Sequence, residues 1–280
     1  MKRIYFLFAL TFGQITLFAQ QYTSEDIPGV FSVSPHKKVI FSKGNLQACY
    51  DGSEYHWRFA AHQYEHIGDA PGNTTIDRPA KGEIVDLFSW STENNNFGIR
   101  CDEQVDYGKF RDWGMLINDD RGWRTLGCFE WEYVCGLSRG YRRNRNERME
   151  FGKPACTIVW ARDSLMIDGK ICPDGIFLYP DKYNYNEIGK GGPDSWKEIE
   201  LKGVVFLPGQ GYRFGLEIGG APCGYYWASD YPTANFNYCK FSANHLLVAN
   251  HLAACSYLRR EYGMSVRLVR DYNHKNKKNR

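Results

Sequence analysis

The stretch GWRTLGCFEWEYV, residues 122–134, is typical of a tight turn that leads into a short helix. Gly127 can occupy the N-cap, and Glu130, three residues later, can reach back to the first free backbone N–H groups. We therefore predict a helix that continues to a stop near Gly140. This helix would bury one of two stripes: Phe129, Val134 and Leu137, or Trp131, Val134 and Cys135.

Two carboxylates in this stretch raise the question of catalysis. Glu130 and Glu132 are two residues apart, so on a helix they point to different faces and do not form the acid pair of a glycoside hydrolase. Glu132 could instead form an ion pair with Arg124, although a surface pair contributes little. We predict a structural role for four residues: Trp123, Glu130, Trp131 and Trp227.

The first residues, MKRIYFLFALTFGQITLFAQQ, are typical of a secretory signal peptide. Lys2 and Arg3 precede an apolar run over residues 4–18, and the small Ala19 follows it. The run is too short and too interrupted for a membrane span, which needs about 20 apolar residues. We expect residues 1–19 to be removed, one domain over residues 20–270 and a basic flexible tail over residues 271–280. The expected location is the periplasm, the cell surface or the extracellular space.

The charge of the chain argues against a nucleic-acid partner. Its formal net charge is +3, and loss of Lys2 and Arg3 lowers this charge to +1. The tail from residue 270 carries five positive and one negative side chains, which leaves the body at about −3. A nucleic-acid partner would call for a clustered basic face.

The nine cysteines follow no regular spacing, and their odd number leaves at least one thiol without a partner in the same chain. An exported chain permits disulfides. Cys128 and Cys135 are seven residues apart, which is too far for a zinc knuckle of the C-x-x-C type. The sequence therefore predicts no metal site and no cofactor.

Short strands separated by turns fit the rest of the chain better than a helical bundle. Alternating residues predict a hairpin over 30–41 with its turn at Pro35, a strand over 57–60 and a last strand over 263–270. A short helix is expected around residues 62–67, and a hairpin with its turn at Asp168 and Gly169. The expected class is α+β, with short helices and long loops.

GWRTL followed by EWEYV resembles a signature of C-type-lectin-fold proteins of the formylglycine-generating-enzyme, or sulfatase-modifying-factor, type. GMSVRLVR resembles the closing strand of that family. The chain also resembles exported proteins of Bacteroides-type bacteria that carry, in order, VFSVS, KVIFSKGNLQ, WRFA, DLFSW, VVFLPGQGYR and GYYWAS. The resemblance covers nearly the whole mature chain, and it implies a C-type-lectin-like fold in which the first strand (VFSVS) and the last (SVRLV) pair.

The resemblance does not settle the activity. The oxidising enzymes of this superfamily use two cysteines near the C-terminus, and here only Cys255 falls in that neighbourhood, because Cys239 is sixteen residues earlier. Sugar-binding C-type lectins use Glu-Pro-Asn or Gln-Pro-Asp for calcium, and neither tripeptide occurs in this sequence. Calcium-dependent sugar binding is therefore not expected.

The segment over residues 231–260 interleaves asparagines with aromatic rings, as adaptable binding surfaces do. In relatives of this fold that are diversified by reverse transcription, the variable positions lie in this part of the chain. The alternative is that these residues are ordinary solvated loop residues. Our candidate ligand-binding residues are Tyr231, Asn235, Phe236, Asn237, Tyr238, Asn244, His245, Asn250 and Tyr257.

The leading hypothesis is an exported, non-catalytic binding protein that recognises a surface glycan or protein through loops of residues 225–260. One alternative is an oxidising enzyme of the formylglycine-generating type, or a relative, that acts on an exported protein. It would be supported by two cysteines within reach of each other. The other alternative, a structural subunit of a surface appendage, predicts a stable assembly on gel filtration.

Overall fold

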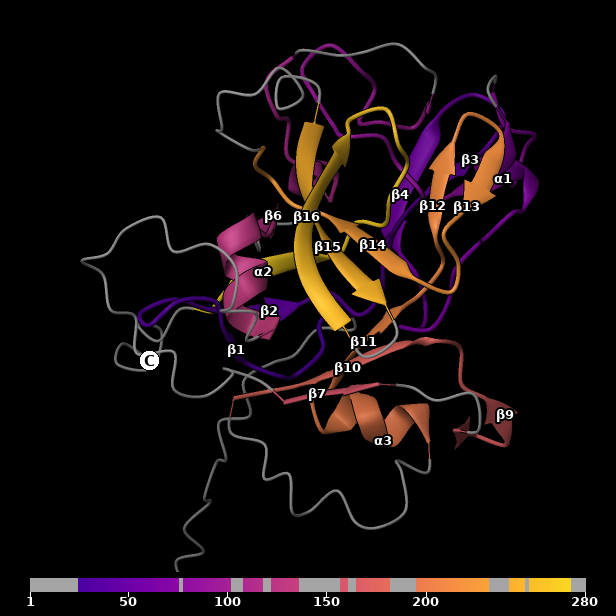
Figure 1. Ribbon diagram of the computed structural model, residues 1–280. Coiled ribbons are helices and arrows are strands. Elements are labelled where there is room, and N and C mark those ends of the chain that lie inside the picture. Colours follow the sequence, from indigo (N-terminus) through magenta and orange to yellow (C-terminus); the bar gives the residue numbers. More distant parts are fainter. Residues whose placement is uncertain are drawn as a thin grey trace, which may run out of the picture.

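The computed structural model describes residues 25–75, 78–101, 108–117, 122–135, 157–160, 165–181, 195–231, 242–249 and 252–272. The described residues form several small, mostly antiparallel sheets and a few short helices (Figure 1). This architecture agrees with the expected sheet-rich α+β class. The helical elements are α1 (Pro71–Thr74), the 3-10 helix η1 (Trp113–Leu116), α2 (Cys128–Cys135) and α3 (Trp196–Leu201).

One four-stranded sheet joins the first described strands to the last. Its order is β1-β2-β17-β6, with β1 Phe31–Ser32, β2 Lys38–Phe41, β17 Leu268–Asp271 and β6 Trp123–Thr125. The predicted hairpin is confirmed, since β1 and β2 pair with Phe31 opposite Val39. The prediction that the last strand pairs with the first was wrong. β2, rather than β1, pairs with β17, because β1 occupies the edge of the sheet.

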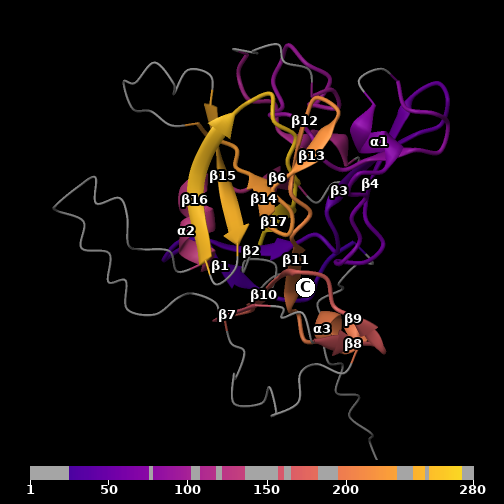
Figure 2. The ribbon, with the colours of Figure 1, turned by 45° about the vertical axis from the view of Figure 1, so that its right-hand side comes forward.

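A second sheet carries the segment in which ligand binding was predicted. Its order is β14-β15-β16, and β15 and β16 form a long hairpin whose eight residue pairs run from Ser242–Arg259 to Ala249–Leu252. In both ribbon views this sheet lies beside α2 (Figures 1 and 2). The strands are β14 Gly224–Trp227, β15 Ser242–Ala249 and β16 Leu252–Arg259.

The remaining strands form two three-stranded sheets and two hairpins. The first three-stranded sheet consists of β4 (Tyr55–Phe59), β3 (Leu46–Tyr50) and β5 (Ile84–Val85), and the second of β11 (Val205–Pro208), β10 (Gly175–Tyr179) and β7 (Thr157–Trp160). The hairpins are β12 (Tyr212–Phe214) with β13 (Glu217–Gly219), and β8 (Met166–Ile167) with β9 (Lys170–Ile171). The predicted turn at Asp168 and Gly169 joins β8 to β9, with positive φ at both positions.

Helix α2 closes the core between the first two sheets. Trp131 is fully buried, and the centroid of its ring lies 5.9 Å from that of Phe41 and 6.3 Å from that of Tyr226. Val134 and Cys135 are buried beside it, whereas Phe129 is 72% exposed. The stripe that includes Trp131 is therefore the buried one, and the alternative prediction, burial of the stripe that includes Phe129, was wrong.

The helix predicted around residues 62–67 was wrong, and the predicted end of α2 cannot be compared with the structure. Residues 62–67 form turns, and the only helix near them is α1, which begins at Pro71. The proline explains this position, because its fixed φ suits the first turn of a helix. The predicted stop of α2 near Gly140 lies outside the described residues, as does Leu137. Within the described part of the chain, every helix is too short or too polar to cross a bilayer.

Candidate functional site

The start of α2 carries the glutamate half of a capping box, because the residue before the helix, Gly127, has no side chain. A carboxylate oxygen of Glu130 accepts a hydrogen bond from the backbone N–H of Gly127 at 3.0 Å. The guanidinium of Arg124 donates to both oxygens of the same carboxylate, at 2.7 and 2.8 Å. Burial favours a raised pKa for Glu130, but the bonds from Arg124 and Gly127 outweigh it and leave the pKa lowered. Arg124 thus pairs with Glu130, instead of the predicted Glu132.

Replacing Glu130 by alanine is expected to lower the free energy of unfolding by about 1–2 kcal/mol, because the cap and a charged hydrogen-bond pair are lost together. Chemical denaturation at neutral pH measures this loss. Glu54→Ala is the control, since the Glu54 side chain is 73% exposed and its only ion-pair contact with a described residue is a 4.0 Å approach to His56. Equal stabilities of the two variants would show that the capping box contributes nothing.

The three tryptophans with predicted structural roles are all buried. Trp123 is 6% exposed, and Trp131 and Trp227 are fully buried. The indole N–H of Trp227 donates to the carbonyl of Phe88 at 2.6 Å, and that of Trp131 to the carbonyl of Trp227 at 3.4 Å. These bonds satisfy the polar ends of large buried rings and link α2 to β14.

Two of the predicted ligand-binding residues present exposed rings. Tyr231 is 50% exposed just after β14, and Tyr257 is 52% exposed on β16. The backbone of Asn244 pairs with that of Tyr257 in the β15–β16 hairpin. The other candidates, Asn235, Phe236, Asn237, Tyr238 and Asn250, lie outside the described residues.

Tyr231 is held on a rigid support. Its ring meets the buried ring of Trp90 edge to face, at a centroid distance of 6.2 Å and an angle of 83°. The guanidinium of Arg260 lies 4.4 Å from the centroid of Trp90 and 5.2 Å from that of Tyr231. Arg260 is fixed in turn, since it is 5% exposed and donates to the carbonyl of Gly108 at 3.1 Å. We call Trp90, Tyr231 and Arg260 the tyrosine platform.

His245 does not belong to an exposed face. It is 1% exposed and lies against Tyr225 and Trp227, at ring centroid distances of 5.6 and 6.2 Å. Its Nδ1 has no hydrogen-bond partner among the residues that the structure describes, and burial lowers its pKa to about 4. A neutral, buried imidazole cannot contact a ligand at the surface, so we leave His245 out of the binding face.

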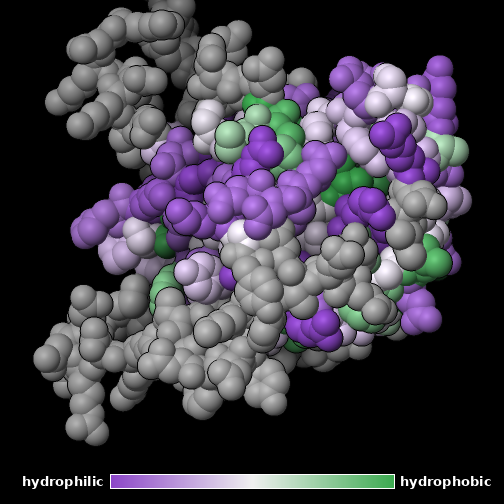
Figure 3. Space-filling model, turned by 90° about the horizontal axis from the view of Figure 1, so that it is seen from above, coloured by the Kyte–Doolittle hydropathy of each residue, from purple (hydrophilic) through white to green (hydrophobic). Residues whose placement is uncertain are grey.

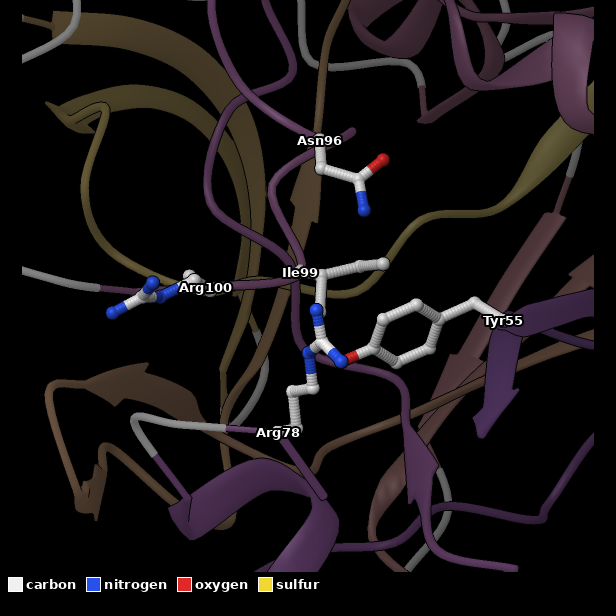
Figure 4. Close-up of a pocket in the computed structure, with 5 residues that line it drawn as sticks. All are labelled: Tyr55, Arg78, Asn96, Ile99 and Arg100. Carbon is white, nitrogen blue, oxygen red and sulfur yellow. The ribbon is translucent and has the colours of Figure 1, made fainter. Parts of the chain in front are cut away.

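A cleft that the sequence reasoning missed lies elsewhere, next to β4. Its volume is about 540 Å³, and Figure 4 shows the guanidinium of Arg78 directed toward the hydroxyl of Tyr55. Burial raises the pKa of Tyr55, and the charges of Arg78, Arg213 and Arg100 oppose that rise. This cleft could not be predicted from the sequence, because its lining comes from separate segments: Tyr55, Arg78, Asn96, Ile99 and Arg100.

Two cysteines and a glutamate that were not expected to meet are brought together by α2 and β16. The ligand atoms of Cys128, Glu132 and Cys255 all lie within 4.8 Å of one another. The thiol of Cys255 also lies 3.4 Å from the carbonyl oxygen of Cys128. Sequence spacing relates Cys128 to Cys135 and Cys255 to Cys239, and it carries no signal for a pair 127 residues apart.

Comparisons of this chain with protein-family models, with curated proteins and with solved structures find no match.

Proposed function

We propose that this chain is an exported, non-catalytic binding protein of C-type-lectin-like fold, which recognises a surface glycan or protein through residues 225–260. The tyrosine platform carries the proposal. It places a half-exposed ring at the start of this segment and holds that ring in position through the buried Trp90 and Arg260. A ring fixed before binding loses little conformational freedom when a ligand packs on it.

Several observations support this assignment. Strands β1 and β2 share one sheet with β17, although the resemblance implies direct pairing of β17 with the first strand and the structure pairs it with β2. Seen from above, the described surface is mostly hydrophilic with smaller apolar areas, which suits a polar ligand better than an apolar partner (Figure 3). The cleft at Tyr55 and Arg78 supplies a ring and a guanidinium, which suit a carboxylate- or sulfate-bearing sugar.

One observation favours the enzyme alternative. Cys128 and Cys255 are within reach of each other, which is the arrangement that an oxidising enzyme of the formylglycine-generating type would need. The pKa of Cys255 counts against the enzyme alternative. The hydrogen bond with Cys128 and, as a smaller effect, burial raise this pKa far above its ordinary value. The reactive form of cysteine is the thiolate, so this thiol is a poor nucleophile at neutral pH. A Cys255→Ala variant that keeps all activity would count against the enzyme.

Replacing Tyr231 by alanine is expected to weaken binding to the glycan or cell surface by about tenfold or more, as for an aromatic anchor of an interface. The comparison uses bound protein as a function of concentration, with the wild type measured in parallel. Leu201→Ala is the matched control, because Leu201 is 71% exposed on α3, far from β14–β16 in Figure 1. Unchanged binding by Tyr231→Ala would remove the platform from the binding face.

A further inference from the structure

The cluster of Cys128, Glu132 and Cys255 has the composition of a metal site. Cys128 and Glu132 are four residues apart on α2, so they share one face of the helix. β16, which presents Cys255, lies beside that helix in both ribbon views (Figures 1 and 2). All three side chains are partly buried, and their ligand atoms lie within 4.8 Å of one another.

The surroundings of the cluster are acidic. Asp230 accepts a hydrogen bond from the backbone N–H of Cys128 at 3.0 Å. Burial and, after it, the charge of Asp230 raise the pKa of Glu132. The groups that raise the pKa of Cys255 include Cys128, Glu132 and the buried thiol of Cys135. Among the described residues, the groups that act on Glu132 and Cys255 are carboxylates and thiols, while Arg124 is bound to Glu130 and Asp271.

We propose that Cys128, Glu132 and Cys255 bind a divalent thiophilic ion of the Zn²⁺ class. Thiolate ligands select zinc over magnesium or calcium, and zinc accepts a carboxylate beside them. Zn–S bonds of about 2.3 Å and Zn–O bonds of about 2.1 Å place tetrahedral ligand atoms about 3.6–3.8 Å apart, within the observed limit. Three protein ligands leave the fourth position for water.

A metal ion explains the whole cluster better than a disulfide does. A bond between Cys128 and Cys255 would leave the carboxylate of Glu132 partly buried beside Asp230, and none of the described residues that act on Glu132 is positively charged. A cation neutralises the carboxylate and both thiolates, which lose their protons to water on binding. The bound ion would fix the start of α2 to β16, the strand that carries Tyr257.

Titration of the purified, reduced full chain with Co²⁺ tests this proposal. We expect one Co²⁺ per chain with thiolate-to-cobalt charge-transfer absorption, and its displacement by Zn²⁺. Cys255→Ser is expected to weaken Co²⁺ binding by about 100-fold or more and Glu132→Gln by about tenfold, since each removes a ligand. Cys49→Ser is the matched control, because Cys49 lies in β3, in another sheet, and its loss should leave Co²⁺ binding unchanged.

Two results would overturn the proposal. The first is Co²⁺ binding that stays unchanged in both Cys128→Ser and Cys255→Ser, with circular dichroism showing that both variants fold. The second is a peptide map of the protein, purified without reductant, in which Cys128 is joined to Cys255. The tyrosine platform makes no use of these side chains, so failure of the metal site would leave the proposed binding function standing.

Discussion

Replacing Trp131 by alanine is expected to lower the free energy of unfolding by about 3–5 kcal/mol. The ring is fully buried between two sheets, against Phe41 and Tyr226, so its removal leaves a cavity in the core. Its indole N–H bond to the carbonyl of Trp227 would be lost as well. Urea unfolding followed by circular dichroism measures the change.

The control for this prediction lies on the same helix. Phe129 is 72% exposed, so Phe129→Ala removes an aromatic side chain of similar chemistry without opening a cavity. We expect its free energy of unfolding to stay within about 0.5 kcal/mol of that of the wild type. Equal losses in the two variants would contradict the packing of α2 described above.

Acidification from pH 7 to pH 4 is expected to destabilise the protein by up to about 3 kcal/mol through His245 alone. Burial lowers the pKa of His245 to about 4, from an ordinary value of 6.5. Between these two pH values His245 is protonated in the unfolded chain but neutral in the folded chain, so the free energy of unfolding falls as the pH falls. The contribution of neutral His245 to the free energy of unfolding is complete above pH 6.5 and is lost by about pH 4.

The variant His245→Phe isolates this effect. Phenylalanine keeps an aromatic ring against Tyr225 and Trp227 but has no proton to bind. The difference in unfolding free energy between wild type and variant should therefore shift by about 3 kcal/mol between pH 7 and pH 4, because other titrating groups cancel. If the unfolding free energies of wild type and His245→Phe changed with pH in parallel, His245 would not be buried in a neutral form.

Much of the local structure could be predicted from short-range patterns. The residues of the capping box, the hairpin over β1 and β2, and the turn at Asp168 and Gly169 all lie within a few residues of their partners. Such contacts depend on turn geometry and on side chains that reach nearby backbone groups, and both are visible in the sequence.

The contacts that position the candidate sites come from distant segments, so periodicity could not show them. His245 stands among asparagines and aromatic residues in the sequence, yet the packing of β15 on β14 buries it. Trp90 and Arg260 meet under Tyr231 only because the loop after β5 lies against the end of β16. The packing of α2 on β16 likewise brings Cys128 close to Cys255.

Direct binding tests the proposed recognition of a ligand on a cell surface. The purified chain over residues 20–280 would be applied to a glycan array and to intact cells, beside the Tyr231→Ala variant. We predict saturable binding of the wild type to at least one of these surfaces, and binding by the variant that is weaker by about tenfold or more. Wild-type binding no higher than background on both surfaces would contradict the proposed function.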